Sequence, residues 1–132
     1  MPYLSKRSEG KLITCREELQ RICRSVIQYY DFAVIHGYRG RVIQNELYRQ
    51  GFSKLKFPKS YHNKKLSEAV DLAPYPIDWR DTRRFDILAG RMLETADMMG
   101  LTLIWGGDWD NDDDLKDQTF NDLGHYQIIL NY

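Results

Sequence analysis

Apolar positions along the chain recur with the spacing of helices and of short strands. Near the amino-terminal end they step by three and four residues, at Leu12, Cys15, Leu19, Ile22, Val26 and Tyr29. This spacing is typical of one face of an amphipathic helix. Thr14 with Glu17 has the pattern of a capping box, so we expect the regular helix to begin there. Two further helices are predicted at 42–49 and 82–99, the second closed by Gly100.

Four short runs of apolar and β-branched residues predict strands, at 32–35, 69–72, 101–105 and 125–130. Helices and strands mix without the regular alternation that a parallel sheet requires, so the expected fold class is α+β. With 132 residues, the chain has the length of a single domain.

Composition removes several classes of function. Lysine plus arginine and aspartate plus glutamate number 19 each, so no net positive charge favours a nucleic-acid partner. No run approaches the ~20 apolar residues of a membrane span, and the first residues lack the apolar core of a signal peptide. We therefore expect a protein that is made in a cytoplasm and has no membrane span.

The two cysteines, Cys15 and Cys23, are eight residues apart in one predicted helix. That spacing separates them by about 12 Å along the helix axis. A disulfide needs Cα atoms within about 7 Å, so the two are not expected to pair with each other. They are interpreted as packing residues.

Candidate chemistry centres on the three histidines, His36, His62 and His125. Imidazole is the commonest zinc ligand, and catalytic zinc sites use three protein ligands plus a water. Asp71 lies among apolar neighbours, where a carboxylate is costly unless it is paired or bound to a metal. Asp122 precedes His125 by three residues, and the glycine between them would let the backbone turn so that both side chains face one point. Each piece alone is more often an ordinary polar pair, but together they fit a metal with an activated water.

Several motifs occur in order along nearly the whole chain. They are Gly37-Tyr38-Arg39, Ser60-x-His62, Ala69-Val70-Asp71-Leu72, Ala73-Pro74-Tyr75 with Ile77-Asp78-Trp79, Gly106-Gly107-Asp108-Trp109, and Asp122-x-x-His125. Together they resemble the zinc D-Ala-D-Ala peptidase family, and within it the phage L-alanyl-D-glutamate endopeptidases that serve as endolysins. The resemblance implies a small antiparallel sheet that carries the zinc site and packs against three helices, the D-Ala-D-Ala peptidase/hedgehog-like fold.

The resemblance also implies a role for each matching residue. His62, Asp71 and His125 would be the zinc ligands. Asp122 would be the general base that takes a proton from the attacking water and delivers it to the leaving amine. Arg39 would stabilise the oxyanion or bind a substrate carboxylate, because a guanidinium is planar and always charged.

One segment departs from the family pattern. Eight residues separate His62 from Asp71, two more than the family usually has, and the stretch 64–67 replaces a glycine. An insertion that bulges outward would leave both ligands in place, whereas one that shifts His62 would weaken zinc binding. Glu68 is a less favoured substitute ligand. His36 is expected to be a packing residue, or at most a residue of the pocket wall or a support for the ligands.

An acidic loop precedes the last predicted strand. Asp108, Asp110, Asp112 and Asp114 place a carboxylate at every second position, and Asp117 follows. Alternating oxygen ligands are how a loop wraps Ca²⁺, although the glycine and glutamate of an EF-hand are missing. Some phage endopeptidases of this type resemble it in having an Asp-rich, calcium-responsive loop. We expect either a regulatory calcium site or a solvated acidic loop.

The resemblance implies zinc-dependent hydrolysis of the L-Ala–D-Glu bond in the peptidoglycan stem peptide by a monomeric endolysin. Such a protein would be made in the host cytoplasm and reach the cell wall through a holin-type pore. Two alternatives stay open: a D-Ala-D-Ala carboxypeptidase or dipeptidase on the same scaffold, and a non-catalytic peptidoglycan-binding relative. Basic residues could attract anionic envelope polymers or simply keep a loop soluble; they are Lys54, Lys56, Lys59, Lys64 and Lys65.

Overall fold

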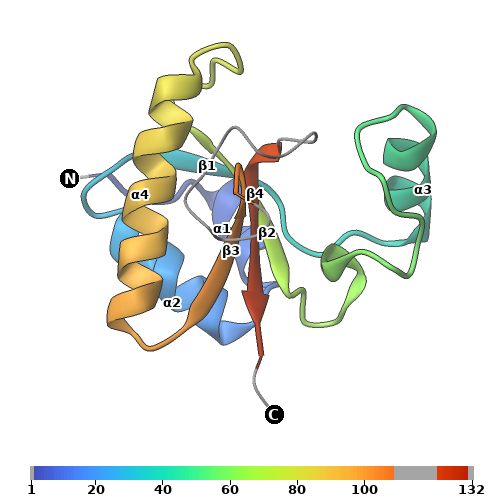
Figure 1. Ribbon diagram of the computed structural model, residues 1–132, viewed down its shortest axis with the longest axis horizontal. Coiled ribbons are helices and arrows are strands. Elements are labelled where there is room, and N and C mark those ends of the chain that lie inside the picture. Colours follow the sequence, from blue (N-terminus) through green and yellow to red (C-terminus); the bar gives the residue numbers. More distant parts are fainter. Residues whose placement is uncertain (1, 109–121, 131–132) are drawn as a thin grey trace.

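A four-stranded antiparallel sheet forms the centre of the molecule (Figure 1). The computed structural model describes residues 2–108 and 122–130. The strands are β1 (Phe32–His36), β2 (Ala69–Pro74), β3 (Thr102–Gly106) and β4 (Asp122–Ile129). Their spatial order is β1-β2-β4-β3, so the last strand in the chain lies between β2 and β3. All four predicted strands are present, and β4 begins early enough to include Asp122.

Three helices pack against the sheet or against one another: α1 (Lys6–Leu12), α2 (Glu17–Val26) and α4 (Thr82–Met98). α1 packs on β1, α4 contacts β2, β3 and β4, and α2 packs against α4. The predicted α+β class is therefore confirmed. A further helix, α3 (Arg41–Arg49), stands apart from this layer together with the loop that follows it (Figure 1).

The amino-terminal helix is broken where the apolar spacing predicts one continuous helix. The N-cap position of α2 is Arg16 and not Thr14, so the predicted capping box was wrong. Thr14 Oγ1 instead donates to the Lys11 carbonyl at 2.6 Å and accepts from the Tyr38 N–H at 2.9 Å. The spacing hides the break because Cys15, which lies within it, is fully buried like a residue of a helix face.

Both cysteines are free and buried, as the sequence predicts. Burial raises the pKa of the Cys15 thiol to about 12, and it raises the pKa of Cys23 as well. Thiols that ionise so reluctantly are poor nucleophiles and poor metal ligands. Their packing role follows from this environment.

The apolar core lies around the inward face of α4 and the strands that it covers. That face carries Phe85, Leu88, Ala89, Met92 and Ala96. Tyr126 of β4 is among the largest fully buried side chains. Within residues 2–108 and 122–130, no helix has both the length and the apolar character needed to cross a membrane.

Residues 40–60, here termed the α3 lobe, are held differently. None of the lobe's apolar side chains is buried, and Gln44 is the one buried residue of α3. Gln44 Nε2 donates to Ser53 Oγ at 2.9 Å and to the Leu55 carbonyl at 2.7 Å. Gln44 Oε1 accepts from Asn63 Nδ2 at 3.2 Å. Polar contacts around one amide therefore replace an apolar core in this lobe.

Candidate metal centre and active site

Strand pairing brings Asp71 of β2 and His125 of β4 together. The two residues are direct partners in the antiparallel register, and Asp71 is also the partner of His36 on β1. Residues directly opposite each other on antiparallel strands place their side chains on the same face. The three side chains therefore form a row across the sheet, which the sequence alone did not show.

β4 carries a bulge beside this row. The pairing of β4 with β3 is regular as far as Tyr126, after which Gly106 pairs with Asp122. A Cβ on Gly124 would lie 2.6 Å from the Leu72 carbonyl oxygen, and one on Gly106 would lie 2.0 Å from that of Asp122. The bulge brings Asp122 and His125 to the wall of one cavity, as predicted, although Gly124 lies within β4, where the lack of a side chain also lets the backbone of β2 approach. Bulges next to active sites re-aim side chains in this way.

His62 comes from η1 (Tyr61–Asn63), a single turn of 3₁₀ helix. The Ser60 and Asn63 side chains cap it reciprocally. The Arg39 N–H donates to the His62 carbonyl at 2.8 Å, and Asn63 Nδ2 donates to the Arg39 carbonyl at 3.0 Å. These bonds fix η1 to the segment that follows β1.

The longer segment between the two expected ligands bulges outward. Lys64, Lys65 and Leu66 are exposed, whereas Ser67 is fully buried. The first of the two alternatives for this insertion therefore applies, and His62 stays within the site. Glu68 is not part of the candidate metal cluster among the described residues.

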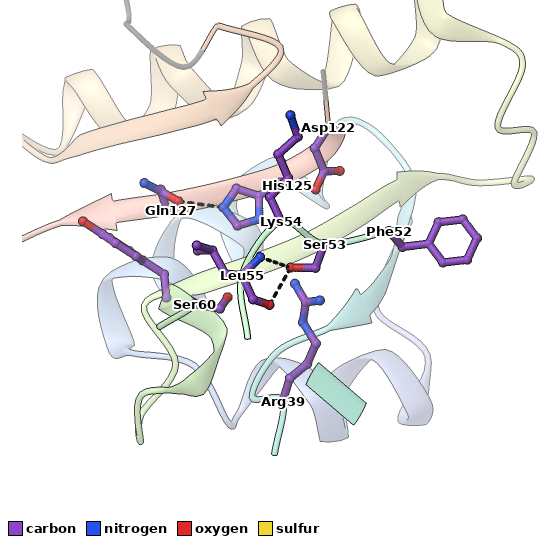
Figure 2. Close-up of a pocket in the computed structure, with 10 residues that line it drawn as sticks. Arg39, Phe52, Ser53, Lys54, Leu55, Ser60, Asp122, His125 and Gln127 are labelled. Atoms are coloured by element: carbon purple, nitrogen blue, oxygen red, sulfur yellow. Dashed lines mark hydrogen bonds between the residues drawn. The ribbon is translucent and has the colours of Figure 1, made fainter. Parts of the chain in front are cut away.

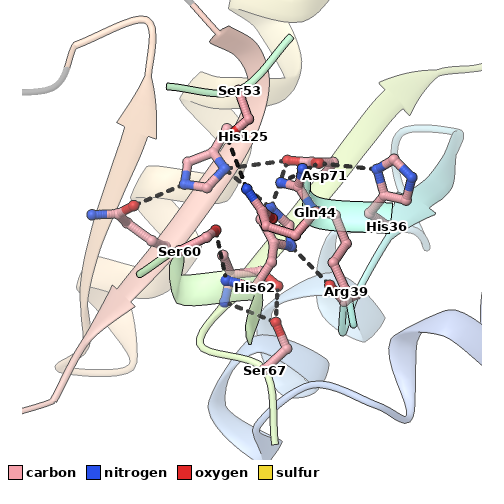
Figure 3. Close-up of polar contacts among 12 residues, drawn as sticks. His36, Arg39, Gln44, Ser53, Ser60, His62, Ser67, Asp71 and His125 are labelled. Atoms are coloured by element: carbon pink, nitrogen blue, oxygen red, sulfur yellow. Dashed lines mark hydrogen bonds and ion pairs between the residues drawn. The ribbon is translucent and has the colours of Figure 1, made fainter. Parts of the chain in front are cut away.

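Three ligand atoms converge at the centre of the site (Figure 3). His62 Nε2 and His125 Nδ1 lie 3.1 and 3.2 Å from Asp71 Oδ1, and 3.3 Å from each other. The outer nitrogens face acceptors: His62 Nδ1 donates to the Gly37 carbonyl at 2.7 Å, and His125 Nε2 donates to Gln127 Oε1 at 2.8 Å. In the neutral imidazoles, both inner nitrogens therefore carry the lone pairs that a metal ion would accept. Such a cluster could hold a metal ion.

The electrostatics of the metal-free cluster favour a bound cation. Burial opposes ionisation of Asp71, but the surrounding histidines outweigh it and hold the pKa of this carboxyl well below its usual value. Burial lowers the pKa of His62. Burial acts in the same direction on His125, yet its hydrogen bond to Asp71 and the nearby charges of Asp71 and Asp122 raise its pKa overall. An ionised carboxylate between two imidazoles is thus the preferred state.

Arg39 and Asp122 flank the three ligand atoms. The Arg39 side chain is buried, with Nη2 at 3.4 Å from Asp71 Oδ2, and its Nε has no hydrogen-bond partner among residues 2–108 and 122–130. Burial lowers the pKa of Arg39, although a guanidinium stays charged in proteins. Burial and the charge of Asp71 raise the pKa of Asp122. A fixed cation and a carboxylate with increased proton affinity are the components of acid–base hydrolysis.

Comparison with known proteins identifies a family for the chain. A sequence profile of the phage L-alanyl-D-glutamate peptidase family matches residues 1–129. The chain belongs to this family. The L-alanyl-D-glutamate peptidase of Escherichia phage T5 is 33% identical over 134 residues, covering 94% of this chain and 96% of that relative.

The crystal structure of the Serratia marcescens L-Ala D-Glu endopeptidase ChiX has a similar fold. Its TM-score is 0.76 at 25% sequence identity, across 97% of this chain and 91% of that one. The resemblance inferred from ordered motifs and the predicted fold class are both confirmed.

In this family member, the structure brings together the ligands predicted from the sequence, and the sequence did not indicate one of their supports, Gln127. Gln127, which holds His125, carries no sequence signal beyond its place two residues later in the same strand. His36 Nδ1 lies 3.4 Å from Asp71 Oδ2, so it supports a candidate ligand, as one of its predicted roles allowed. Of the predicted calcium ligands, Asp108 is buried. The others lie outside the described residues, namely Asp110, Asp112, Asp114 and Asp117.

Two cavities adjoin the cluster and share Arg39, Phe52 and Asp122 in their walls. One, of about 290 Å³, includes the candidate ligand His125 in its lining (Figure 2). The other, of about 230 Å³, includes the candidate ligand Asp71. The candidate metal centre therefore lies where the two cavities meet.

Proposed function

We propose that this family member hydrolyses the L-alanyl–D-glutamate bond of peptidoglycan stem peptides, with a zinc ion held by His62, Asp71 and His125. The convergence of these three ligand atoms between two cavities is the observation that carries the proposal. Family membership supports the substrate, since the phage T5 relative and the Serratia protein are both named for this bond. The expected action at the cell wall after holin-type release, as a monomer, is part of the same proposal.

The donor set suits zinc. Zinc bound tetrahedrally at about 2.0–2.1 Å from nitrogen and oxygen has ligand atoms roughly 3.3–3.4 Å apart. The three separations of 3.1, 3.2 and 3.3 Å are close to these values. Each imidazole already donates its outer N–H to an acceptor, as ligating histidines in proteins generally do. Two histidines and one carboxylate leave a fourth position free, as in hydrolytic zinc sites.

A bound zinc ion would lower the pKa of a water molecule and polarise the scissile carbonyl. Asp122 is placed to take a proton from the attacking water, and its raised pKa lets it hold that proton and pass it to the departing nitrogen of D-glutamate. Arg39, which lines both cavities, would stabilise negative charge that develops on the carbonyl oxygen. The bond between alanine and glutamate breaks, leaving an alanine carboxylate and a glutamate amine.

The test combines metal content with product analysis. Purified protein is expected to contain one zinc per chain and to release new L-Ala carboxyl ends and D-Glu amino ends from purified peptidoglycan. Asp122→Asn should keep its zinc and lose about 10²–10⁴-fold in kcat, because general acid–base catalysis has that magnitude. Asp97→Asn on the exposed surface of α4 is the matched control and should keep full activity.

Other outcomes identify the alternatives. Release of free D-Ala would show a D-Ala-D-Ala carboxypeptidase on the same scaffold. Binding to peptidoglycan with neither zinc nor cleavage would show a non-catalytic relative. Zinc retention with undiminished turnover in Asp122→Asn would remove Asp122 from the mechanism.

A further inference from the structure

A single buried amide connects the cavities with the turn that carries His62. Gln44 is fully buried, whereas every other residue of α3 is exposed or half-buried. We propose, on the basis of the function proposed above, that Gln44 is a positioning residue of the active site. It joins residues 52–55, here termed the cavity wall, to the turn of the candidate ligand His62. Zinc binding at the turn thereby stabilises the wall against which the substrate binds.

The cavity wall belongs to the site through its side chains. Phe52 lines both cavities, and Ser53 and Leu55 line the larger one together with His125 (Figure 2). No apolar side chain of the α3 lobe is buried, so no apolar core fixes the wall. Its position therefore depends on hydrogen bonds.

The nitrogen of the Gln44 amide gathers the polar groups of the wall. Gln44 Nε2 donates to Ser53 Oγ at 2.9 Å and to the Leu55 carbonyl at 2.7 Å, which uses both of its hydrogens. The Leu55 N–H donates to the same Ser53 Oγ at 3.2 Å. A backbone carbonyl only accepts, so the amide nitrogen must face Leu55 and the amide oxygen must face away from the wall.

The oxygen of the same amide reaches the metal side. Gln44 Oε1 accepts from Asn63 Nδ2 at 3.2 Å, and Asn63 Nδ2 also donates to the Arg39 carbonyl at 3.0 Å. Asn63 Oδ1 accepts from the Ser60 N–H at 3.0 Å. Backbone groups at Arg39 and Ser60 thus fix the orientation of the second amide as Leu55 fixes that of the first.

The two amides form a continuous chain from the wall to the ligand turn (Figure 3). Asn63 directly follows His62 in η1, and both Gln44 and Asn63 are buried. If the wall moved away from the turn, buried donors and acceptors would lose their partners, which is costly. The positions of the wall and the turn are therefore linked. By linkage, a ligand that stabilises one of them stabilises the other.

Kinetics of Gln44→Met tests the positioning role. Methionine keeps the approximate length and volume of the side chain and makes none of its three hydrogen bonds. With a soluble L-Ala–D-Glu stem peptide and saturating zinc, KM should rise about tenfold, the scale of one or two hydrogen bonds. kcat should stay within about twofold, because the wall binds substrate and does not touch the reacting atoms. A merely structural role would instead lower the folded fraction, and with it kcat, at unchanged KM.

Gln50→Met is the matched control. Gln50 is exposed at the end of the same helix, and its Nε2 donates to Glu46 Oε1 at 3.0 Å. This variant should keep the KM and kcat of the wild type.

Hydrogen exchange tests the coupling without any cleavage. The Phe52 and Ser53 N–H groups donate to the Leu47 carbonyl at 2.9 and 3.2 Å, so their exchange reports on the order of the wall. In the wild type, zinc should slow this exchange about threefold, the scale of one hydrogen bond. In Gln44→Met, zinc should bind without changing it. Exchange in α2, which packs against α4, is the internal reference and should not respond to zinc in either protein.

Ser53→Ala covers the case in which Gln44→Met fails to fold. It removes one of the two bonds from Gln44 to the wall, so the effect of zinc on exchange should shrink. An undiminished effect in Ser53→Ala or in Gln44→Met overturns the proposal, and so does an unchanged KM in Gln44→Met.

The two readouts separate this proposal from the function on which it rests. A wild-type protein that cleaves the peptide and shows no zinc effect on the wall keeps the proposed function and overturns the coupling. A protein in which zinc slows exchange through Gln44 without any cleavage keeps the coupling and removes the proposed function. A protein that binds no zinc overturns both.

Discussion

Asp71 and His125 lie on neighbouring strands, and their positions follow from the register of β2 and β4. His62 lies on a 3₁₀ turn that polar contacts tie to the segment after β1. The first pair is set by the hydrophobic core, since a shift of one residue would turn every side chain of the strand to the other face. The second depends on a few hydrogen bonds next to a lobe without an apolar core. The site therefore has a rigid half on the sheet and a half held by polar contacts.

Removing Asp71 should have the largest effect, because this residue joins the two halves. Its Oδ1 faces both ligand histidines and its Oδ2 faces Arg39. Even the loss of a residue that merely supports a ligand costs about 10–100-fold in metal affinity, so Asp71→Ala should exceed about 100-fold. Competition with a chelator of known affinity measures this. Asp97→Ala on α4 should bind zinc like the wild type, and equal affinity in both variants would exclude Asp71 from the metal site.

A methyl group at Gly124 should destabilise the half of the site that lies on the sheet. The added Cβ would lie 2.6 Å from the Leu72 carbonyl oxygen. Neither backbone can shift without disturbing the hydrogen-bonded pairing of β2 or β4. We expect Gly124→Ala to lower the free energy of unfolding by about 3 kcal/mol, the upper end for overpacking. Urea denaturation monitored by circular dichroism measures it.

Gly90→Ala is the matched control for this change. Gly90 lies in α4 with nothing within 4 Å of its added Cβ. It should raise the free energy of unfolding by about 1 kcal/mol, since alanine is the better helix former. Changes of opposite sign in the two variants support the close approach at Gly124, whereas a stable Gly124→Ala contradicts it.

Gln127→Leu tests how strongly zinc binding by the sheet half depends on the hydrogen bond to the outer nitrogen of His125. Leucine keeps the approximate size of the side chain but leaves the His125 Nε2–H without its acceptor at 2.8 Å. Zinc affinity should fall roughly tenfold, with activity restored at saturating zinc. Gln28→Leu, exposed after α2, is the control. His62 has no such weak point, because its acceptor is the backbone carbonyl of Gly37. Unchanged affinity in Gln127→Leu would mean that the strand alone orients His125.

The smallest effect concerns proton binding in the metal-free protein. The pKa of His125 is raised and that of His62 is lowered from 6.5. His125 therefore contributes stability that is present below pH 6.5 and is lost as pH rises through its folded-state pKa. The contribution of His62 is present above pH 6.5 and is lost as pH falls through its folded-state pKa. NMR titration of the two imidazoles should show His125 protonating at the higher pH, and the reverse order would contradict the asymmetry between the halves.

The candidate ligands at the centre of the site could be predicted from the sequence because the chemistry of metal binding restricts which residues can serve. The predicted strand 69–72 contains a carboxylate, and the chain has few histidines. Few combinations of these residues could form a metal site. The outward course of the segment after His62 was one of two open alternatives, since its direction depends on contacts of η1 with residues over twenty positions away. The break between α1 and α2 was missed because a buried residue there continues the helical spacing.

The remaining misses have a common physical origin. The role of Gly124 depends on a carbonyl of another strand, and the role of Gln127 depends on the tautomer and rotamer of His125. The row from His36 through Asp71 to His125 needs the register of three strands. Local sequence patterns predict individual helices and strands. The contacts of Gly124 and Gln127 and the row of three side chains form only when the strands have paired.

The strand order has a consequence for the timing of synthesis. β4 follows β1, β2 and β3 in the chain, yet it lies between β2 and β3 in the sheet. Until it emerges, β3 has no partner strand and the cluster lacks His125, so a growing chain holds an incomplete sheet and an incomplete metal site. Domains acquire their long-range contacts late when those contacts join distant segments. A hydrolase with this topology cannot complete its candidate metal site until β4 has been synthesised and has paired with β2.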